Sequence, residues 1–161
     1  MAKKKSSSSD DGVLLVAENR KAQHDYEILE TVEAGIVLLG AEVKSLREGH
    51  GNLRDSYVRA ISGELYLVGC HILPYKFARS EELSPLRDRK LLVHKKEMEK
   101  LLTNVTRKGL TLIAIKLYFK DGKCKVLVAV GRGKKAHDKR DDLKKREAER
   151  EMERGFKARS K

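Results

Sequence analysis

Residues 110–130 read LTLIAIKLYFKDGKCKVLVAV, and this stretch decides the fold. Two apolar runs, 110–119 and 123–130, flank the Asp121-Gly122 pair, which is typical of a tight turn between antiparallel strands. In the second run, lysines alternate with Cys124 and Val126, the period that gives a strand one buried and one exposed face. The stretch therefore predicts a β-hairpin.

Four segments upstream of this hairpin are also typical of strands. They are residues 26–38, 53–61, 64–72 and 89–93. The second and third lie on either side of Ser62-Gly63, which is a hairpin signal. Gly35 interrupts the first segment and predicts a bend or a bulge there.

Three short helices are expected between these strands, at residues 19–24, 40–48 and 94–105. The side chain of Asn19 can cap the first helix, and Gly49 ends the second. The third is the clearest, because its apolar residues form one stripe; they are Met98, Leu101, Leu102 and Val105.

The order of these elements shows no β-α-β alternation, so a parallel sheet is disfavoured. We expect a mainly β fold: a closed antiparallel barrel of the oligonucleotide-binding type, with about six strands and three short helices. The barrel domain is expected over residues 13–131, after a disordered leader at residues 1–12 that is rich in Lys, Ser and Asp.

Positive charge is divided unevenly along the chain. The 36 Lys and Arg residues exceed the 24 Asp and Glu residues, giving a net charge of +12. Residues 13–131 hold 20 basic and 15 acidic side chains, whereas residues 132–161 hold 13 and 7. An excess of this size indicates a polyanionic partner: nucleic acid, an anionic membrane or an acidic protein.

Residues 132–161 form a basic C-terminal tail that has too few large apolar residues to bury a face. Pairs such as Asp141 with Lys145, and Asp142 with Arg146, favour a helix at a spacing of four. We therefore expect the tail to be disordered when free and helical when a partner supplies the missing stabilisation.

The sequence excludes several classes of protein. No apolar run is long enough to span a membrane, and the N-terminus lacks the apolar region of a secretory signal. Cys70 and Cys124 are expected to be reduced thiols of a cytoplasmic protein. No metal-binding spacing of His or Cys, no nucleophile motif and no complete phosphate loop occurs. We expect no enzyme activity, no metal and no cofactor.

Basic side chains gather at a few places within the predicted barrel. The clusters are Arg20-Lys21, Lys44 with Arg47, Arg87/Arg89/Lys90, and Lys95-Lys96. Each is explained equally well as a solvated surface or as a phosphate-binding edge. Tyr118 and Phe119 on the predicted hairpin likewise have two interpretations: members of the core or its rim, or a platform on which a base stacks.

Seven segments, taken together, carry a resemblance. They are NRKAQHDY (19–26), EAGIVLLGAEVKSLREG (33–49), DSYV (55–58), HILPY (71–75), RKLLVHKKEM (89–98), GLT…LYF (109–119) and GKKAHDKRDDLKKRE (133–147). In this order and spacing they resemble small protein B, the bacterial family that binds transfer-messenger RNA (tmRNA, or SsrA RNA). The likeness covers about residues 13–155. Leu73 and Val93 stand where Pro and Leu are frequent in the family, and both are apolar changes.

The resemblance implies a function as well as the barrel. The body would bind the tRNA-like domain of tmRNA, and the tail would fold as a helix in the decoding centre and empty mRNA channel of the 70S ribosome. The complex would enter stalled ribosomes with elongation factor Tu, GTP and alanyl-tmRNA, as a monomer and without a membrane. Trans-translation would then tag the nascent peptide and rescue the ribosome.

Two sets of site residues follow from the resemblance and the basic clusters. The predicted tmRNA contacts are Asn19, Arg20, Lys21, Glu33, Lys44, Ser45, Arg47, Arg89 and Lys90. The predicted ribosome contacts in the tail are Gly133, Lys134, Lys135, His137, Asp138, Lys139, Arg140, Lys144, Lys145 and Arg146. Two alternatives from other classes stay open: a general translation factor or RNA chaperone with no dedicated RNA, and an RNA-processing enzyme.

Overall fold

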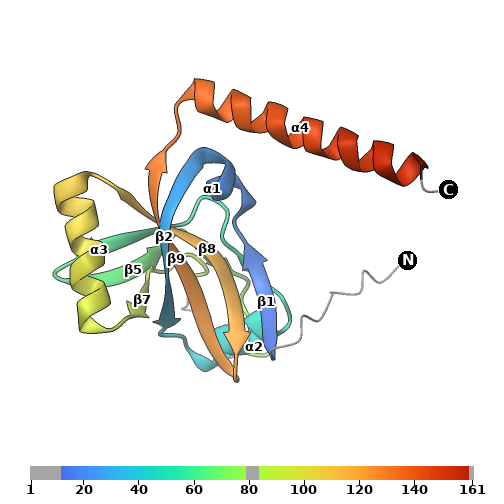
Figure 1. Cartoon of the computed structure of the whole chain (residues 1–161). Coiled ribbons are helices and arrows are strands. Elements are labelled where there is room, and N and C mark those ends of the chain that lie inside the picture. Colours follow the sequence, from blue (N-terminus) through green and yellow to red (C-terminus); the bar gives the residue numbers. More distant parts are fainter. Residues whose placement is uncertain (1–11, 79–83, 160–161) are drawn as a thin grey trace.

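The fold is taken from a computed structural model of the chain, which describes residues 12–78 and 84–159. Within these residues there are nine strands and four helices (Figure 1). The strands are β1 (Val13–Glu18), β2 (Tyr26–Ile36), β3 (Gly51–Asn52), β4 (Tyr57–Ile61), β5 (Glu64–Val68), β6 (His71–Ile72), β7 (Arg89–Leu92), β8 (Thr111–Lys120) and β9 (Lys123–Gly133). The helices are α1 (Arg20–Asp25), α2 (Gly40–Arg47), α3 (Lys95–Lys108) and α4 (Ala136–Arg159).

Six of the described strands close into an antiparallel ring in the order β8-β4-β5-β7-β2-β9, and β9 returns to β8. Strand β1 lies outside the ring along β8, and β3 pairs with β6 in a small separate sheet. Closure leaves the ring without unpaired edges, as a small barrel requires. The predicted mainly β fold with a closed antiparallel barrel is confirmed.

The β8–β9 hairpin forms as the sequence predicts. Lys120 pairs with Lys123 across the turn, and Asp121 and Gly122 both have left-handed backbones, with φ of 50° and 73°. Two successive positive φ angles match the twist of the flanking strands. Strand β9 is longer than expected, because it keeps pairing with β2 as far as Gly133, opposite Tyr26. Two residues of the predicted tail, 132 and 133, therefore belong to the barrel.

The strands differ from the predicted ones in several places. The segments predicted at 53–61 and 64–72 are each shortened, because the chain turns through positive φ at Asp55 and at Gly69. The irregularity predicted at Gly35 lies instead at Leu29 of β2. Gly35 pairs with both neighbouring strands, and an added Cβ there would lie 3.4 Å from the Cβ of Leu92. Strand β1 was not predicted as a separate element.

The three short helices occur where the sequence places them. Helix α3 lays its apolar stripe on the barrel, with Leu101 buried, and ends at Gly109, whose φ is 61°. Glycine adopts this left-handed conformation without a steric penalty. Inside the ring lie side chains that are almost completely buried; they include Leu65, Leu67, Leu91, Leu112, Val126 and Val128.

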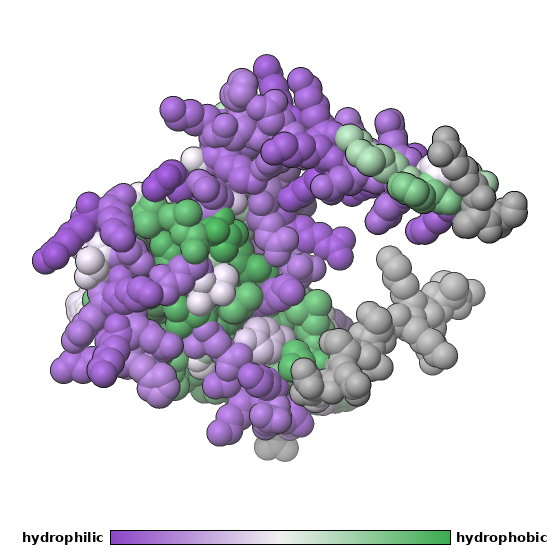
Figure 2. Space-filling view, in the orientation of Figure 1, coloured by the Kyte–Doolittle hydropathy of each residue, from purple (hydrophilic) through white to green (hydrophobic). Residues whose placement is uncertain are grey.

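Helix α4 projects from the barrel after β9 (Figure 1). Figure 2 shows its surface as hydrophilic along most of its length, with apolar atoms gathered near its C-terminal end. Met152 and Phe156 are the large apolar residues there, and both are exposed. None of the described side chains of α4 is buried. The helix therefore has no packed face on the barrel.

Candidate nucleic-acid interface

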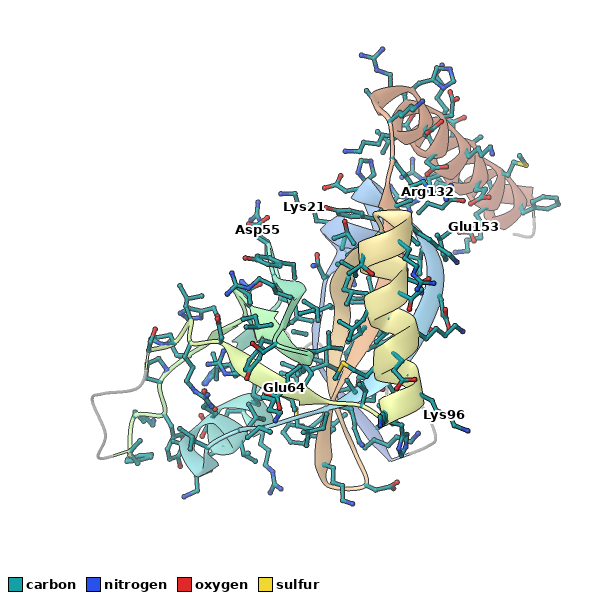
Figure 3. All side chains as sticks on the ribbon, turned by 90° about the vertical axis from the view of Figure 1, so that its left-hand side faces the viewer. Lys21, Asp55, Glu64, Lys96, Arg132 and Glu153 are labelled. Carbon is teal, nitrogen blue, oxygen red and sulfur yellow. The ribbon has the colours of Figure 1, made fainter. Side chains whose placement is uncertain are left out.

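The first group of predicted RNA contacts lies on α1. Asn19 is buried, and its Oδ1 accepts a hydrogen bond from the backbone N–H of Ala22 at 3.1 Å, which is the predicted helix cap. Arg20 and Lys21 are exposed, and Lys21 forms an ion pair with Asp55 at 3.0 Å (Figure 3). The structure thus keeps both cations accessible and gives Asn19 a structural role.

Helix α2 presents two exposed cations over aromatic rings. The Nζ of Lys44 lies 5.7 Å from the ring centre of Tyr75, and the guanidinium of Arg47 lies 5.7 Å from that of Phe119. Among the described residues, neither cation takes part in an ion pair. Both charges are therefore available to a polyanion without the loss of a carboxylate partner.

Two polar contacts hold α2 in place. Ser45 is fully buried, and its hydroxyl donates to the carbonyl of Leu73 at 2.5 Å, so it does not present its hydroxyl to a ligand. Glu42 is also buried and accepts from Arg87 at 2.6 Å and from Arg89 at 2.9 Å. Burial alone would raise the pKa of Glu42. Hydrogen bonds from Arg87, from the backbone N–H of Leu39 at the start of α2 and from Arg89 instead hold this pKa below its ordinary value.

Arg89 is a correction to the predicted interface. Its side chain is 0% exposed. Besides Glu42, its guanidinium donates to the backbone carbonyls of Cys70, Pro85 and Arg87 at 2.8 to 3.1 Å. All of these donors are used inside the protein, so Arg89 cannot contact RNA. It joins β7 to α2 and to the segment that precedes the strand.

Lys90 lies on the opposite face of β7, because successive side chains of a strand alternate. It is partly exposed and forms an ion pair with Glu64 at 2.6 Å. The hydrogen bond from Lys90 lowers the pKa of Glu64 and raises that of the lysine itself. Lys90 is therefore accessible, but it must give up a carboxylate to bind a phosphate.

Glu33 lines a surface hollow of about 540 Å³ on the outside of the barrel. Its Oε2 accepts a hydrogen bond from the Tyr118 hydroxyl at 2.5 Å and lies 3.8 Å from Lys120. Burial, together with the carboxylate of Glu33, raises the pKa of Tyr118 far above its ordinary value, so the phenol stays protonated. The side chain of Glu33 is 37% exposed, which leaves it accessible to a ligand.

Six further residues line this hollow, and none was among the predicted contacts; they are Gly35, Leu92, Val93, His94, Glu97 and Lys125. Leu92 is 53% exposed, whereas Leu91 beside it is buried. The sequence indicated that one of these two leucines is exposed, because two adjacent residues of a strand cannot both face the core. Lys125 precedes the buried Val126 on β9, is itself partly exposed, and takes part in no ion pair among the described residues.

A second hollow of about 330 Å³ continues the first toward α2. The two share Gly35, Leu92 and Lys125, and the second is also lined by Phe119 and by Val43 of α2. Arg47 lies over the ring of Phe119 on the same side. The surface from Glu33 to α2 is thus continuous, and it combines apolar side chains with the cations Arg47 and Lys125 and the carboxylates Glu33 and Glu97.

The predicted tail contacts follow β9 directly. The backbone N–H of Lys134 donates to the carbonyl of Asp25 at 2.9 Å, and the ammonium group of Lys139 lies 3.4 Å from the Asp25 carboxylate. The hydrogen bond with His24, and then Lys139, hold the pKa of Asp25 below its ordinary value. Lys134 also forms an ion pair with Asp142. These contacts attach the start of α4 to α1.

The other predicted tail residues are exposed or partly exposed; they are Gly133, Lys135, His137, Asp138, Arg140, Lys144, Lys145 and Arg146. His137 is 84% exposed, and its Nδ1 lies 3.2 Å from Asp141. Basic side chains also recur every three or four residues along one side of α4, interrupted once by Leu143; they are Lys139, Arg146, Arg150, Arg154 and Lys157. This spacing places them on one face of the helix.

No group of His, Cys, Asp or Glu residues that could hold a metal ion occurs among residues 12–78 and 84–159. None of the helices within the described part of the chain is long and apolar enough to cross a membrane. The surface features described above are cations, aromatic rings and partly exposed carboxylates on a barrel.

Comparison with known proteins agrees with the resemblance predicted from the seven segments. The family model described as "SmpB protein" matches residues 16–158. The SsrA-binding protein of Syntrophotalea carbinolica is 53% identical over 148 residues, covering 92% of this chain and 99% of the relative. That of Thermosynechococcus vestitus is 53% identical over 150 residues, with 92% and 99% covered.

A solved structure described as "tmRNA-SmpB: a journey to the center of the bacterial ribosome" contains a similar chain. It is 52% identical, covers 78% of this chain and 86% of its own, and has a TM-score of 0.62. The sequence resemblance is thereby confirmed, and the barrel is shared with a solved relative. The chain belongs to the SmpB protein family.

Proposed function

We propose that this protein is an RNA-binding adaptor of trans-translation, and not an enzyme. The barrel binds the tRNA-like domain of tmRNA, and α4 enters the decoding centre and empty mRNA channel of a stalled ribosome. Family membership supports this assignment. So does the solved relative that is described with tmRNA and the bacterial ribosome.

The observation that carries the barrel's part is the continuous surface from Glu33 to α2. It combines exposed apolar area at Leu92 with the cations Arg47 and Lys125, neither of which is ion-paired among the described residues. RNA that is folded like tRNA offers phosphates and unstacked loop bases to such a surface. Glu33 accepts hydrogen bonds from ribose hydroxyls or base amino groups there.

The tail's part rests on the charge distribution of α4. The basic face extends from Lys139 to Lys157, which corresponds to about 27 Å along a helix. Lys and Arg at this spacing follow a phosphate backbone, and an exposed His137 can stack on a base. An RNA-lined channel also supplies the contacts that α4 lacks on the barrel.

The adaptor works as a monomer and is delivered together with alanyl-tmRNA, elongation factor Tu and GTP. No catalytic group is required of it, because hydrolysis and peptide transfer belong to its partners. What it contributes is recognition of one RNA by the barrel and of a second RNA by the tail.

Competition binding tests the barrel's part. Labelled tRNA-like domain of tmRNA is displaced by unlabelled domain or by bulk tRNA at roughly 150 mM salt, where non-specific phosphate binding is weak. We expect the domain to compete far better than bulk tRNA. Equal competition would exclude the dedicated adaptor and favour a general RNA chaperone.

A pair of matched charge variants tests whether RNA binds at the hollow that contains Glu33 and Lys125. Lys125→Ala should weaken binding and reduce the slope of log affinity against log salt by about one. Lys108→Ala removes the same charge from the C-terminal end of α3, far along the helix from His94 and Glu97 of the hollow, and should leave both quantities unchanged. If the two variants behave alike, RNA does not bind at the hollow that contains Glu33 and Lys125.

A further inference from the structure

An aromatic cluster lies beside α2, outside the hollows described above. The rings of Tyr75 and Phe77 meet edge to face, with their centres 5.6 Å apart. The backbone N–H of Ala78 donates to the Tyr75 carbonyl at 2.9 Å and closes a turn that keeps both rings on one side. Leu73 and Tyr75 also line a cavity of about 160 Å³ next to the rings.

Phe77 is the feature that needs an explanation. It is 72% exposed, although phenylalanine is among the residues most often buried. Leu73, nearby in the chain, is 47% exposed, so the apolar area is not a single isolated side chain. An exposed apolar patch that a fold maintains marks a contact with a partner.

Two lysines give the cluster its chemical character. Lys44 lies over the Tyr75 ring at 5.7 Å, and Lys76 lies over the Phe77 ring at 5.0 Å. Within residues 12–78 and 84–159, neither lysine belongs to an ion pair. Aromatic faces next to unpaired ammonium groups match a nucleotide, because the base stacks on a ring and the phosphate meets a lysine.

We propose that Tyr75 and Phe77 form a stacking site for an unstacked base of the same RNA that the barrel binds. This inference rests on the proposed function. The assignment to that RNA follows from α2: Val43 and Arg47 border the hollow beside Phe119, while Lys44 reaches Tyr75. One helix thus joins both surfaces, so a bound RNA extends from the hollow to the rings.

Stacking occurs by displacement of an ammonium group. Each lysine covers one face of its ring in the free protein, and an incoming base replaces it on that face. The displaced ammonium group then pairs with the phosphate that enters with the base. Specificity is for an unpaired and flexible nucleotide rather than for one base type, since every base has a face that can stack.

The chain contains five tyrosines but no tryptophan, so Phe77→Trp introduces one indole at the site, which can be excited at a wavelength that tyrosine does not absorb. Titration of this full-length variant with the tRNA-like domain of tmRNA should quench its fluorescence, because a stacked base lies against the indole. The control is Thr103→Trp, on the exposed side of α3 and away from α2 (Figure 1). It should bind the RNA equally well without quenching.

Affinity measurements complete the test. Phe77→Ala should bind the domain about ten-fold more weakly, as expected for the loss of one stacked base, while Phe77→Trp and Phe77→Tyr keep the wild-type affinity. The thermal midpoint should be unchanged in all three because the ring is exposed.

Three results would overturn the inference. If Phe77→Ala binds as tightly as the wild type, or Phe77→Trp binds without quenching, the stacking site is refuted while the proposed function stands. If the wild type itself does not prefer the domain over bulk tRNA, the proposed function fails and the stacking site fails with it.

Discussion

Glu42→Gln is the change that best tests how the fold positions the RNA surface. The substitution keeps the size and shape of the side chain but removes its charge. Glu42 is 6% exposed and receives hydrogen bonds from Arg87 and Arg89. Arg89, which is 0% exposed, would be left as a buried cation without a carboxylate. The variant therefore isolates the charge of the pair from its packing.

The expected loss of stability is about 3 kcal/mol at pH 7. Removal of one partner from a buried ion pair costs roughly 3–5 kcal/mol, because an uncompensated charge remains inside. The lower end applies here, since the amide oxygen of Gln still accepts one hydrogen bond and Arg87 is partly exposed. A loss of this size is a large fraction of the stability of an ordinary domain.

The difference between wild type and variant should depend on pH in one direction. The folded protein holds the pKa of Glu42 below its ordinary value of 4.5. A lowered pKa adds stability that is fully present above pH 4.5 and is lost as the pH falls through the folded value. Glu42→Gln has no such contribution to lose. The difference in unfolding free energy between the wild type and Glu42→Gln is therefore largest at neutral pH and becomes smaller in acid.

Urea denaturation at pH 7 and at a series of acidic pH values measures this difference. Glu64→Gln serves as the control, because it removes an ion pair of the same 2.6 Å length that lies at the surface; its effect should be much smaller. Glu42→Gln should also weaken RNA binding, since Lys44 and Arg47 lose the anchor of α2. A variant as stable as the wild type at pH 7 would refute this account of the buried pair.

Two further predictions concern the tail. A protein that ends after Lys135 keeps all of β9, whose pairing with β2 extends to Gly133. It should bind the tRNA-like domain nearly as well as the full chain but support no peptide tagging. Loss of most RNA affinity would contradict the division between barrel and tail. Amide hydrogens of α4 should exchange almost without protection in the free protein, because no described side chain of the helix is buried. Strong protection measured without a ribosome would contradict this prediction and show that the helix is stable alone.

Strand β7 shows why sequence alone could not decide which of its two basic residues belongs to the interface. Arg89 and Lys90 were both predicted to lie on one RNA surface, because both are basic. Neighbouring residues of a strand point to opposite faces, so only one of them can be outside. The structure buries Arg89 beside Leu91 and exposes Leu92 beside Lys90. Alternation excludes the joint placement, but only long-range partners such as Glu42 decide which residue is inside.

Local features of the fold were predictable for a related reason. The β8–β9 turn needs only Asp121-Gly122, and α3 needs only its apolar stripe and Gly109, so neighbouring residues suffice. The breaks at Asp55 and Gly69 depend instead on distant contacts: a Cβ at Gly69 would lie 3.2 Å from the carbonyl oxygen of Asp55. The sequence around Gly69 contains no pattern that indicates this close approach of two backbone segments.

The net charge of the barrel is a poor guide to where RNA binds. Several of its cations are neutralised by carboxylates in this structure: Lys21 by Asp55, Lys90 by Glu64 and Lys100 by Glu30. A paired lysine that binds a phosphate must first lose its partner, which offsets part of the gain.

The cations that are not ion-paired among the described residues include Arg47, Lys44 and Lys125, and these border the hollows and the aromatic cluster. A phosphate gains the full interaction at these positions, because no carboxylate has to be displaced. Sequence alone does not reveal which cations are ion-paired, so the distribution of ion pairs separates the accessible charges of the barrel from those that carboxylates neutralise. It also explains how a domain with nearly as many acidic as basic residues can bind a polyanion.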